Sequence, residues 1–147
     1  ELLTSIQGKV AIANAKLTYQ KYLELFGGSR WQALVAKGAQ TQRLLWASTS
    51  TKNKKYRDVM YVEELIGADT VDTIPPATLD AFRDHGKLRA SLTEDVPAAN
   101  KTMESLEKAG ISMKEVTDKL VVDGVKLFAD AFTQLLTTTG KSAGVKA

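Results

Sequence analysis

The sequence predicts a helix-rich α/β fold built around parallel strands. Two short apolar runs, residues 43–47 and 71–74, are too short to be helices and lie between segments with helical periodicity. The order helix, strand, polar loop, helix, strand, helix is typical of βα units, in which a helix returns the chain to start a parallel strand. The chain has 147 residues, 44% of them hydrophobic, which is enough for a buried core.

The N-terminal segment predicts two helices. Apolar residues recur at steps of three and four from Leu3 to Phe26, which indicates one amphipathic helix of about 24 residues. The pair Gly27-Gly28 ends it, because glycine readily adopts the conformation found at helix C-termini. A second, short helix is predicted to begin at Ser29, where Ser29 and Gln32 have the spacing of a capping box, and to stop at Gly38.

The middle of the chain is predicted to contain two strands, each followed by a helix. The first run is continuously apolar rather than alternating, which favours a strand buried on both faces. The second stops at Pro75-Pro76, and proline is well suited to the first turn of a helix. The predicted elements are a strand over 43–47, a helix over 59–66, a strand over 71–74 and a helix over 77–85.

The C-terminal third is predicted to be helical. One helix covers residues 95–109, and a capping box of Ser112 and Glu115 starts a long amphipathic helix. Gly124 predicts a bend or a junction between two helices in this segment. The small and polar residues 137–147 predict a frayed tail.

The sequence predicts more helices than a two-stranded sheet can pack against. Two parallel strands do not form an independent sheet, and three or more are normally required. The first residue is Glu1 rather than Met, and the chain reads as helix from its start. We therefore predict a piece of a longer protein, or else a module that pairs with a partner chain supplying the missing strands.

Composition excludes several functional classes. The sequence has no Cys and one His, His85, so it lacks material for disulfides, a thiol nucleophile or a His- or Cys-based metal site, and we predict no metal. The excess of 20 basic over 17 acidic residues, a net charge of +3, is too small to indicate a nucleic-acid partner. No apolar run approaches the roughly 20 residues that span a bilayer, and no signal-peptide pattern is present. We therefore expect no membrane partner and a cytoplasmic location.

The polar loop over residues 48–55 is the best candidate site. It follows the carboxyl end of a predicted strand, which is where open α/β sheets and barrels bind ligands. Its four consecutive hydroxyls, the Lys52 ammonium and the backbone N–H groups before a helix suit a phosphate group. The alternative is an ordinary solvated loop. The loop has no glycine-rich cradle, so it is not a nucleotide-binding P-loop.

Other polar and aromatic residues are interpreted as structural. Glu63-Glu64 is read as a solvated face, because adjacent helix positions point about 100° apart and do not form an acid–base pair. Lys16 lies off the apolar stripe and is read as a surface lysine rather than a Schiff-base lysine. Four further assignments are a turn at Asp69, a less favoured site-facing carboxylate at Asp69 or Asp72, a helix-dipole partner at His85, and packing for Trp31 and Trp46.

Several blocks of sequence, in order, resemble transaldolases of the longer bacterial, cyanobacterial and plant-type branch. The resemblance covers nearly the whole chain and rests on residues 11–17, 42–53 (QRLLWASTSTKN), 61–67 (YVEELIG), 69–76 (DTVDTIPP) and 124–132. It implies the C-terminal part of a (β/α)₈ barrel, with residues 43–48 as the seventh strand and residues 70–74 as the eighth.

The resemblance also implies a function and a site. Transaldolases transfer a dihydroxyacetone unit between sugar phosphates, in the pentose phosphate pathway, through a lysine Schiff base and without a cofactor. The catalytic residues lie on earlier strands, so none is assigned here, and we expect the chain alone to be inactive. Relatives bind the substrate phosphate after the seventh strand, and the candidate residues here are Ser48, Ser50 and Lys52. Lys52 replaces the usual Arg, and Lys54 replaces a common Pro.

Two hypotheses therefore stand. In the first, residues 1–147 are the C-terminal part of one transaldolase barrel domain, whose partners are sugar-phosphate substrates and the remainder of the barrel. In the second, the chain is a non-catalytic, helix-rich α/β interaction module that requires a partner chain.

Overall fold

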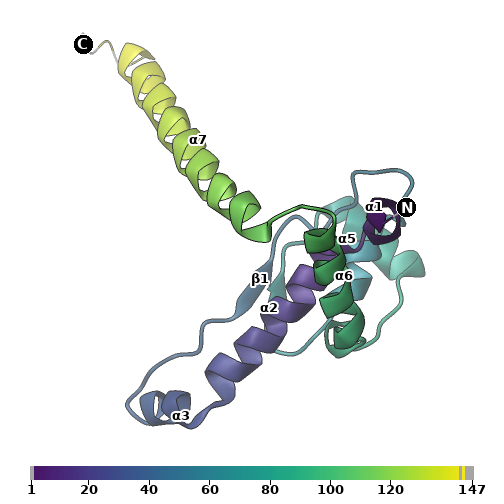
Figure 1. Ribbon diagram of the computed structural model, residues 1–147. Helices are drawn as coiled ribbons and strands as arrows, with labels where there is room; N and C mark the ends of the chain where they lie inside the picture. The colour runs from purple at the N-terminus through teal and green to yellow at the C-terminus, as the bar shows by residue number, and fades with distance from the viewer. Residues whose placement is uncertain (1, 143, 145–147) are drawn as a thin grey trace. The chain divides into compact units, whose positions relative to one another are not determined.

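A computed structural model describes residues 2–142 and 144 of the chain. The chain divides into two compact units, residues 1–109 and residues 110–147. In the first unit, three helices precede the first strand, and one helix lies between the two strands (Figure 1). Two helices and a 3₁₀ turn follow the second strand. Their bounds are α1 Leu2–Ile6, α2 Val10–Gly27, α3 Ser29–Val35, β1 Leu44–Trp46, α4 Met60–Glu64, β2 Thr70–Asp72, α5 Pro76–His85, a 3₁₀ turn at Ser91–Thr93 and α6 Val96–Lys108.

The two strands pair in parallel, which confirms the predicted α/β organisation. Leu44 pairs with Thr70, Leu45 with Val71 and Trp46 with Asp72. The backbone N–H of Thr73 then donates to the Trp46 carbonyl oxygen at 3.0 Å, which extends the pairing beyond β2. Both strands are three residues long, shorter than predicted, and α4 carries the chain between them.

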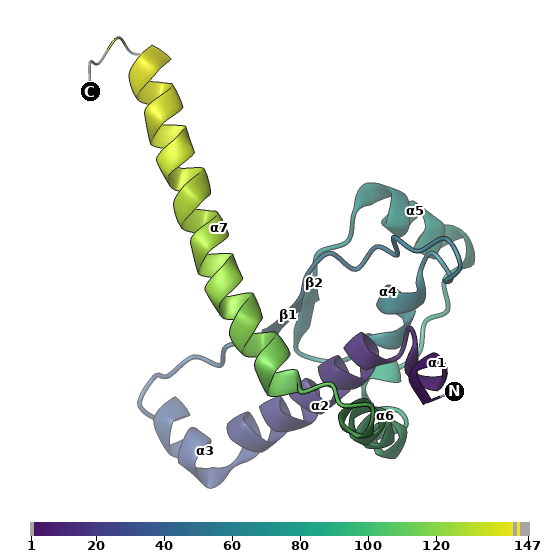
Figure 2. The same ribbon diagram turned by 45° about the horizontal axis from the view of Figure 1, so that its top comes forward.

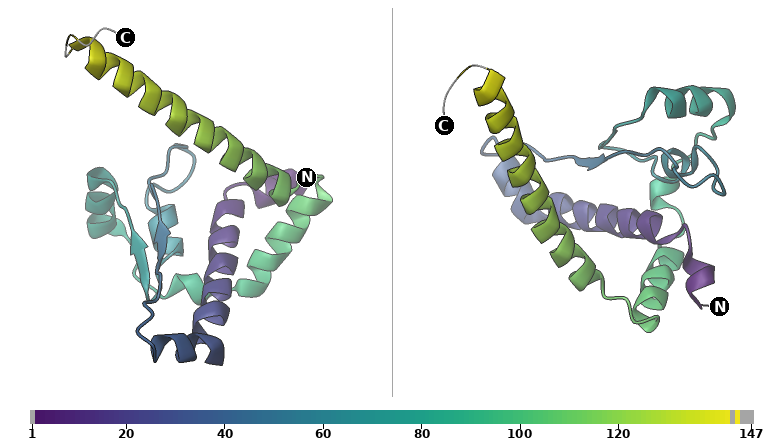
Figure 3. Two further views of the ribbon diagram at one scale, coloured as in Figure 1. Left: turned by 90° about the vertical axis from the view of Figure 1, so that its left-hand side faces the viewer. Right: turned by 90° about the horizontal axis from the view of Figure 1, so that it is seen from above.

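The core lies on one face of the sheet. Helix α2 lies between the sheet and α6 in the views of Figure 3, and α6, which is seen end-on in Figure 2, packs against α2. Leu44 and Trp46 pack against a buried cluster formed by Ala15, Tyr19, Tyr22, Leu65 and Leu92. Leu45, which alternates to the other face, is 53% exposed. The prediction of a strand buried on both faces is therefore wrong, because the described residues cover only one face.

The predicted single N-terminal helix is broken at Gly8. Helix α1 ends at Ile6 and α2 begins at Val10, with Gly8 between them at φ +75°. A side chain at Gly8 would be strained in this left-handed conformation, and its Cβ would lie 3.2 Å from the ring of Tyr56. Glycine is therefore required both by the turn and by the close approach of the Tyr56 ring.

The two predicted capping boxes have different outcomes. Gly28 occupies the N-cap position of α3, and its carbonyl accepts the N–H groups of Trp31 and Gln32. Ser29 is already inside the helix and makes no cap bond, so the first box is wrong. At the second, the N–H of Glu115 donates to the Ser112 Oγ at 3.3 Å, which confirms its serine half.

The second unit contains one helix, α7, over Met113–Ser142 (Figure 1). It continues through Gly124 without a break, so the predicted bend or junction is wrong. It also includes residues 137–142, where a frayed tail is predicted; residues 143 and 145–147 of that tail lie outside the described residues. Three ion pairs at i,i+4 spacing lie along it, and its large apolar side chains are exposed: Val116, Leu120, Val121, Val122, Val125, Leu127, Phe128, Phe132, Leu135 and Leu136.

Candidate functional site

The polar loop begins with two contacts to the chain that follows β2. The backbone N–H of Ser48 donates to the Thr73 Oγ1 at 3.2 Å, and Ser48 adopts φ +56°. The buried Thr49 hydroxyl donates to the Asp72 carboxylate, at 2.9 and 3.2 Å to its two oxygens. Because parallel strands place their carboxyl ends at one edge of the sheet, these contacts fix the start of the loop at that edge.

Asp72 is a half-buried carboxylate that the loop itself uses. Burial raises the pKa of Asp72, and the hydrogen bond from Thr49 acts in the opposite direction. With its oxygens bonded to Thr49, Asp72 holds the loop, and the Thr49 hydroxyl is already committed. The less favoured prediction of a site-facing carboxylate at Asp72 gains no support from these contacts.

The end of the loop is tied down by Arg57. The Thr51 hydroxyl donates to the Arg57 carbonyl oxygen at 3.0 Å. The Arg57 guanidinium donates to both oxygens of Glu63, at 2.9 and 3.0 Å, and to the carbonyl of His85 at 2.7 Å. The backbone N–H of Lys87 donates to the same Glu63 carboxylate at 2.9 Å. One carboxylate on α4 therefore joins the loop to the chain that leaves α5.

The three predicted phosphate-binding residues lie at or between these anchors. Ser48 and Lys52 are exposed and Ser50 is half-buried. Within residues 2–142 and 144, their side chains make no hydrogen bond or ion pair, whereas the hydroxyls of Thr49 and Thr51 are both occupied. The structure therefore leaves two of the four loop hydroxyls and the Lys52 ammonium available to a ligand.

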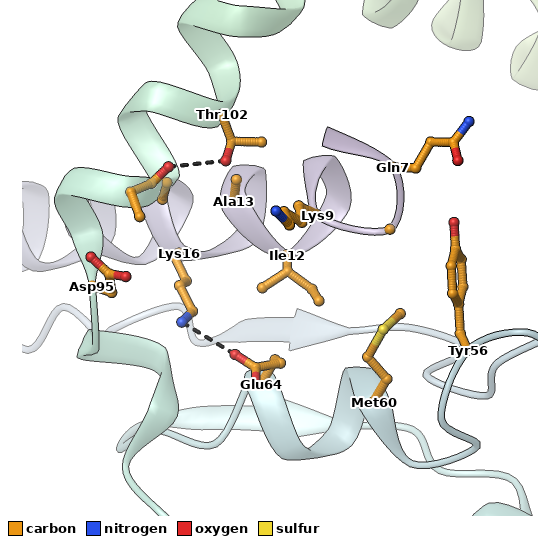
Figure 4. Close-up of a pocket in the computed structure, with 13 residues that line it drawn as sticks. Gln7, Lys9, Ile12, Ala13, Lys16, Tyr56, Met60, Glu64, Asp95 and Thr102 are labelled. Carbon is orange, nitrogen blue, oxygen red and sulfur yellow. Dashed lines mark hydrogen bonds and ion pairs between the residues drawn. The ribbon is translucent and has the colours of Figure 1, made fainter. Parts of the chain in front are cut away.

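Lys16 is buried, so its interpretation as a surface lysine is wrong. Its side chain is 9% exposed, and its Nζ lies 3.4 Å from the Glu64 carboxylate and donates to the Glu94 carbonyl at 3.1 Å. Figure 4 shows this ammonium reaching Glu64 beside a cavity of about 390 Å³, into which Ile12 and Met60 also project. Lys16 lies four residues after Ile12 and three before Tyr19, so it shares a helix face with both, but its partners Glu64 and Glu94 are distant in the sequence.

The pair Glu63-Glu64 is likewise not a solvated face. Glu63 is 8% exposed and binds Arg57, while the half-buried Glu64 pairs with Lys16 and Arg89. The two carboxylates have separate partners, as the angle between adjacent helix positions predicts. The Arg57 guanidinium lowers the pKa of Glu63, and the Lys87 N–H acts in the same direction against the effect of burial. Sequence reasoning missed these partners because Lys16, Lys87 and Arg89 are distant along the chain, and Arg57, six positions before Glu63, lies outside α4.

Both tryptophans and Asp69 have the predicted structural roles. Trp31 contacts Phe26 edge-to-face at 4.7 Å between ring centroids, and its Nε1 donates to the Thr41 hydroxyl. Trp46 packs on the core cluster. Asp69 has φ +58° in the turn before β2, a conformation that aspartate tolerates better than most residues.

His85 lies at the last position of α5, between two carboxylates. Its Nε2 is 2.9 Å from Asp58 and its Nδ1 is 3.0 Å from Asp84. Carboxylates only accept hydrogen bonds, so both contacts are satisfied together only by the protonated imidazole. The hydrogen bond that His85 donates to Asp58 is the main cause of its raised pKa, and the one that it donates to Asp84 is the second. In addition to the predicted interaction with the helix dipole, His85 forms two direct ion pairs.

A raised His85 pKa predicts how this contact depends on pH. The folded chain holds the proton more tightly than the unfolded chain, so the pair stabilises the fold below the ordinary histidine pKa of about 6.5. That contribution is lost as the pH rises through the higher pKa of the folded state. An NMR titration of the His85 ring is expected to give a pKa above the ordinary value, and Asp58→Asn to lower it more than Asp84→Asn does. A His85 pKa at or below the ordinary value would contradict the geometry.

Residues 2–142 and 144 contain neither a metal-binding cluster nor a membrane-spanning helix. No cluster of three or more His, Asp or Glu side chains is placed to hold a metal ion there. None of the helices in this part of the chain is both long and apolar enough to cross a membrane.

Known proteins identify the family. The family model for Transaldolase/Fructose-6-phosphate aldolase matches residues 1–139. The chain belongs to this family. It is 51% identical over 136 residues to Transaldolase 2 of Nostoc punctiforme, 48% identical over 136 residues to the transaldolase of Trichodesmium erythraeum, and 42% identical over 146 residues to that of Mycolicibacterium paratuberculosis. These matches cover 91%, 91% and 98% of this chain.

The same alignments cover a minor part of each relative. The chain spans 36% of the first two transaldolases and 39% of the third, and it matches their C-terminal part. The resemblance predicted from the sequence blocks is therefore confirmed at the level of the family.

Proposed function

We propose that the chain forms the C-terminal part of a transaldolase (β/α)₈ barrel, with β1 as the seventh strand and β2 as the eighth. Three features support this assignment: family membership, parallel pairing of β1 with β2 through the α4 crossover, and helices packed on one sheet face. In a barrel, the face that carries the exposed Leu45 would point inward and be covered by side chains of the other strands.

In this proposal, the complete enzyme transfers a dihydroxyacetone unit between sugar phosphates in the pentose phosphate pathway, in the cytoplasm. A Schiff-base lysine outside the matched segment forms the covalent intermediate, and no cofactor is needed. The residues of this chain bind the phosphate of the substrate. Ser48 and Ser50 donate hydrogen bonds, and Lys52 neutralises charge as a point ammonium rather than a bidentate guanidinium.

One observation carries the phosphate assignment. The loop between β1 and Arg57 is fixed at both ends, and the side chains of Ser48, Ser50 and Lys52 make no hydrogen bond or ion pair within the described residues. The ammonium groups of Lys54 and Lys55 are also unpaired there, and Lys52 is the lysine that follows the four hydroxyls directly. The donors lie just beyond the carboxyl end of β1, the side of a barrel where substrates bind. A carbohydrate phosphate therefore meets fixed hydroxyls and one cation without any rearrangement of the two anchors.

Replacing Lys52 in the full-length protein tests this role. Lys52→Ala is expected to raise KM for fructose 6-phosphate about tenfold, which corresponds to one lost charge-assisted contact, and to change kcat by less than about threefold. Lys54→Ala removes an equally exposed lysine from the same loop and is the matched control, expected to leave both constants unchanged. A KM for Lys52→Ala equal to that of the parent enzyme would argue against phosphate binding here.

The interaction-module hypothesis is favoured by a different observation. Helix α7 exposes ten large apolar side chains within its own unit, and such a surface normally contacts another chain segment. A transaldolase barrel would supply that segment from the same polypeptide, whereas a module would take it from a partner. The gene distinguishes the two: a reading frame that extends about two hundred residues upstream, through a lysine-bearing strand of the family, supports the enzyme.

A further inference from the structure

Glu63 is a buried carboxylate that accepts three hydrogen bonds beside the end of the polar loop. Its side chain is 10% exposed, yet it lies on α4 and outside the loop itself. It accepts two hydrogen bonds from the Arg57 side chain and one from the Lys87 backbone. Burying a carboxylate is costly unless its oxygens are satisfied, and here Arg57 supplies both the opposite charge and two of the donors.

Arg57 passes this restraint to the loop through its main chain. Its carbonyl oxygen accepts the Thr51 hydroxyl at 3.0 Å, and Thr51 lies between Ser50 and Lys52. The planar guanidinium is held at one side by Glu63 and at another by the His85 carbonyl, so the residue has little freedom to move. A path of direct contacts therefore runs from the Glu63 carboxylate through Arg57 to the centre of the candidate phosphate site.

We infer that Glu63, acting through Arg57, is a positioning residue that holds the loop in the shape that binds phosphate. This inference rests on the proposed function. The loop lacks the glycine-rich turn that gathers backbone N–H groups around a phosphate, so its side chains must be placed by other contacts. A loop that is already ordered does not lose conformational entropy when the phosphate binds, and this preorganisation increases affinity.

The neighbouring ion pairs do not share this role. Glu64, the next residue on α4, pairs with Arg89 and with the buried Lys16 on α2. Neither partner contacts residues 48–57 through a hydrogen bond in the described part of the chain. Glu64 is therefore a matched control for Glu63: an adjacent carboxylate, also in ion pairs, but without a connection to the loop.

The experiment compares Glu63→Gln with Glu64→Gln in the full-length protein. The Glu63 change keeps the size of the side chain and an acceptor for Lys87 but removes the charge that fixes Arg57. Glu63→Gln is expected to raise KM for fructose 6-phosphate and the inhibition constant of inorganic phosphate about tenfold each, with kcat within about threefold of the parent. Glu64→Gln is expected to change none of the three by more than about twofold. Arg57→Lys keeps the charge but loses the fork, and it should reproduce the Glu63→Gln effect.

The outcomes separate this inference from the proposed function. If Lys52→Ala raises KM while Glu63→Gln and Arg57→Lys leave KM and phosphate inhibition unchanged, the loop binds phosphate and the positioning role is wrong. A loss of kcat alone in both variants would also overturn it, since it indicates only less folded enzyme. If Lys52→Ala and both positioning variants all leave phosphate binding unchanged, the proposed phosphate site itself fails. In the double variant Lys52→Ala/Glu63→Gln, the expected rise in KM is smaller than the product of the single effects, because both act on one contact.

Discussion

The 147-residue chain alone is expected to show no transaldolase turnover, whereas the complete barrel that we propose is expected to convert sugar phosphates under the same conditions. A (β/α)₈ barrel closes through eight strands and typically needs about 250 residues, while the described part of this chain supplies β1 and β2. Transaldolase chemistry requires a Schiff-base lysine that the resemblance places on an earlier strand. The loss is therefore expected to be complete, larger than the effect of any single substitution considered above.

The measurement is a coupled assay with fructose 6-phosphate and an aldose phosphate acceptor, at enzyme concentrations that would detect about one part in 10⁴ of a typical kcat near 10 s⁻¹. Circular dichroism of the same sample shows whether the chain retains its helices, so that inactivity is not confused with unfolding. Turnover by the pure chain would contradict both the proposed location of the lysine and the proposed division of the barrel. Restored activity on co-expression with the preceding part of the protein would support them.

The organisation of the sheet region could be predicted from the sequence because it depends on local signals. Short apolar runs bounded by glycine, proline and polar residues identified both strands, and the loop after the first was recognised from four consecutive hydroxyls. The start of α5 at Pro76 follows from the fixed backbone angle of proline. In each case, the residues that determine the structure are neighbours in the sequence.

The buried charges could not be predicted in this way. Lys16 contacts Glu94, 78 positions away, and Glu63 accepts from Lys87, 24 positions away. A pattern of charged and apolar residues assigns both to solvent, because the cost of burying a charge is offset only by partners that the fold brings near. The ring of Tyr56 that lies against Gly8 is likewise 48 positions distant, so neighbouring residues do not predict its approach to the turn.

The exposed face of β1 illustrates a different limit. A continuous apolar run indicates a strand that is buried on both sides, and Leu44 and Trp46 do pack on the core. Leu45 is 53% exposed because the residues that would cover it are absent from the described part of the chain. The exposed apolar side chains of α7 likewise indicate a surface that another segment would cover. The sequence pattern therefore reports the environment of the complete barrel that we propose, rather than that of the isolated chain.

Leu92→Ala is expected to destabilise the folded protein by about 2–5 kcal/mol, which is the usual range for truncating a buried leucine. Leu92 is fully buried in the 3₁₀ turn, in the cluster with Tyr19, Tyr22 and Leu65, so its removal leaves a cavity under the sheet. Leu88, four residues earlier, is 82% exposed, and Leu88→Ala is the matched control, expected to stay within about 0.5 kcal/mol. The free energy of unfolding in urea measures both effects; equal losses for the two variants would contradict the assignment of Leu92 to the core.

The contact between Leu92 and Gly67 makes the prediction sharper. A Cβ at Gly67 would lie 2.6 Å from the Leu92 Cδ2 and 2.9 Å from its Cβ, so Gly67→Ala is expected to cost about 1–3 kcal/mol by overpacking. In Gly67→Ala/Leu92→Ala, the new methyl group enters space that the leucine has vacated, and the loss should be at least about 1 kcal/mol smaller than the sum of the single losses. Strict additivity would mean that the two positions do not share one packed site, and that the chain between α4 and β2 is held by other contacts. Because that chain leads directly into β2, where Asp72 accepts the Thr49 hydroxyl, the same packing also supports the start of the polar loop.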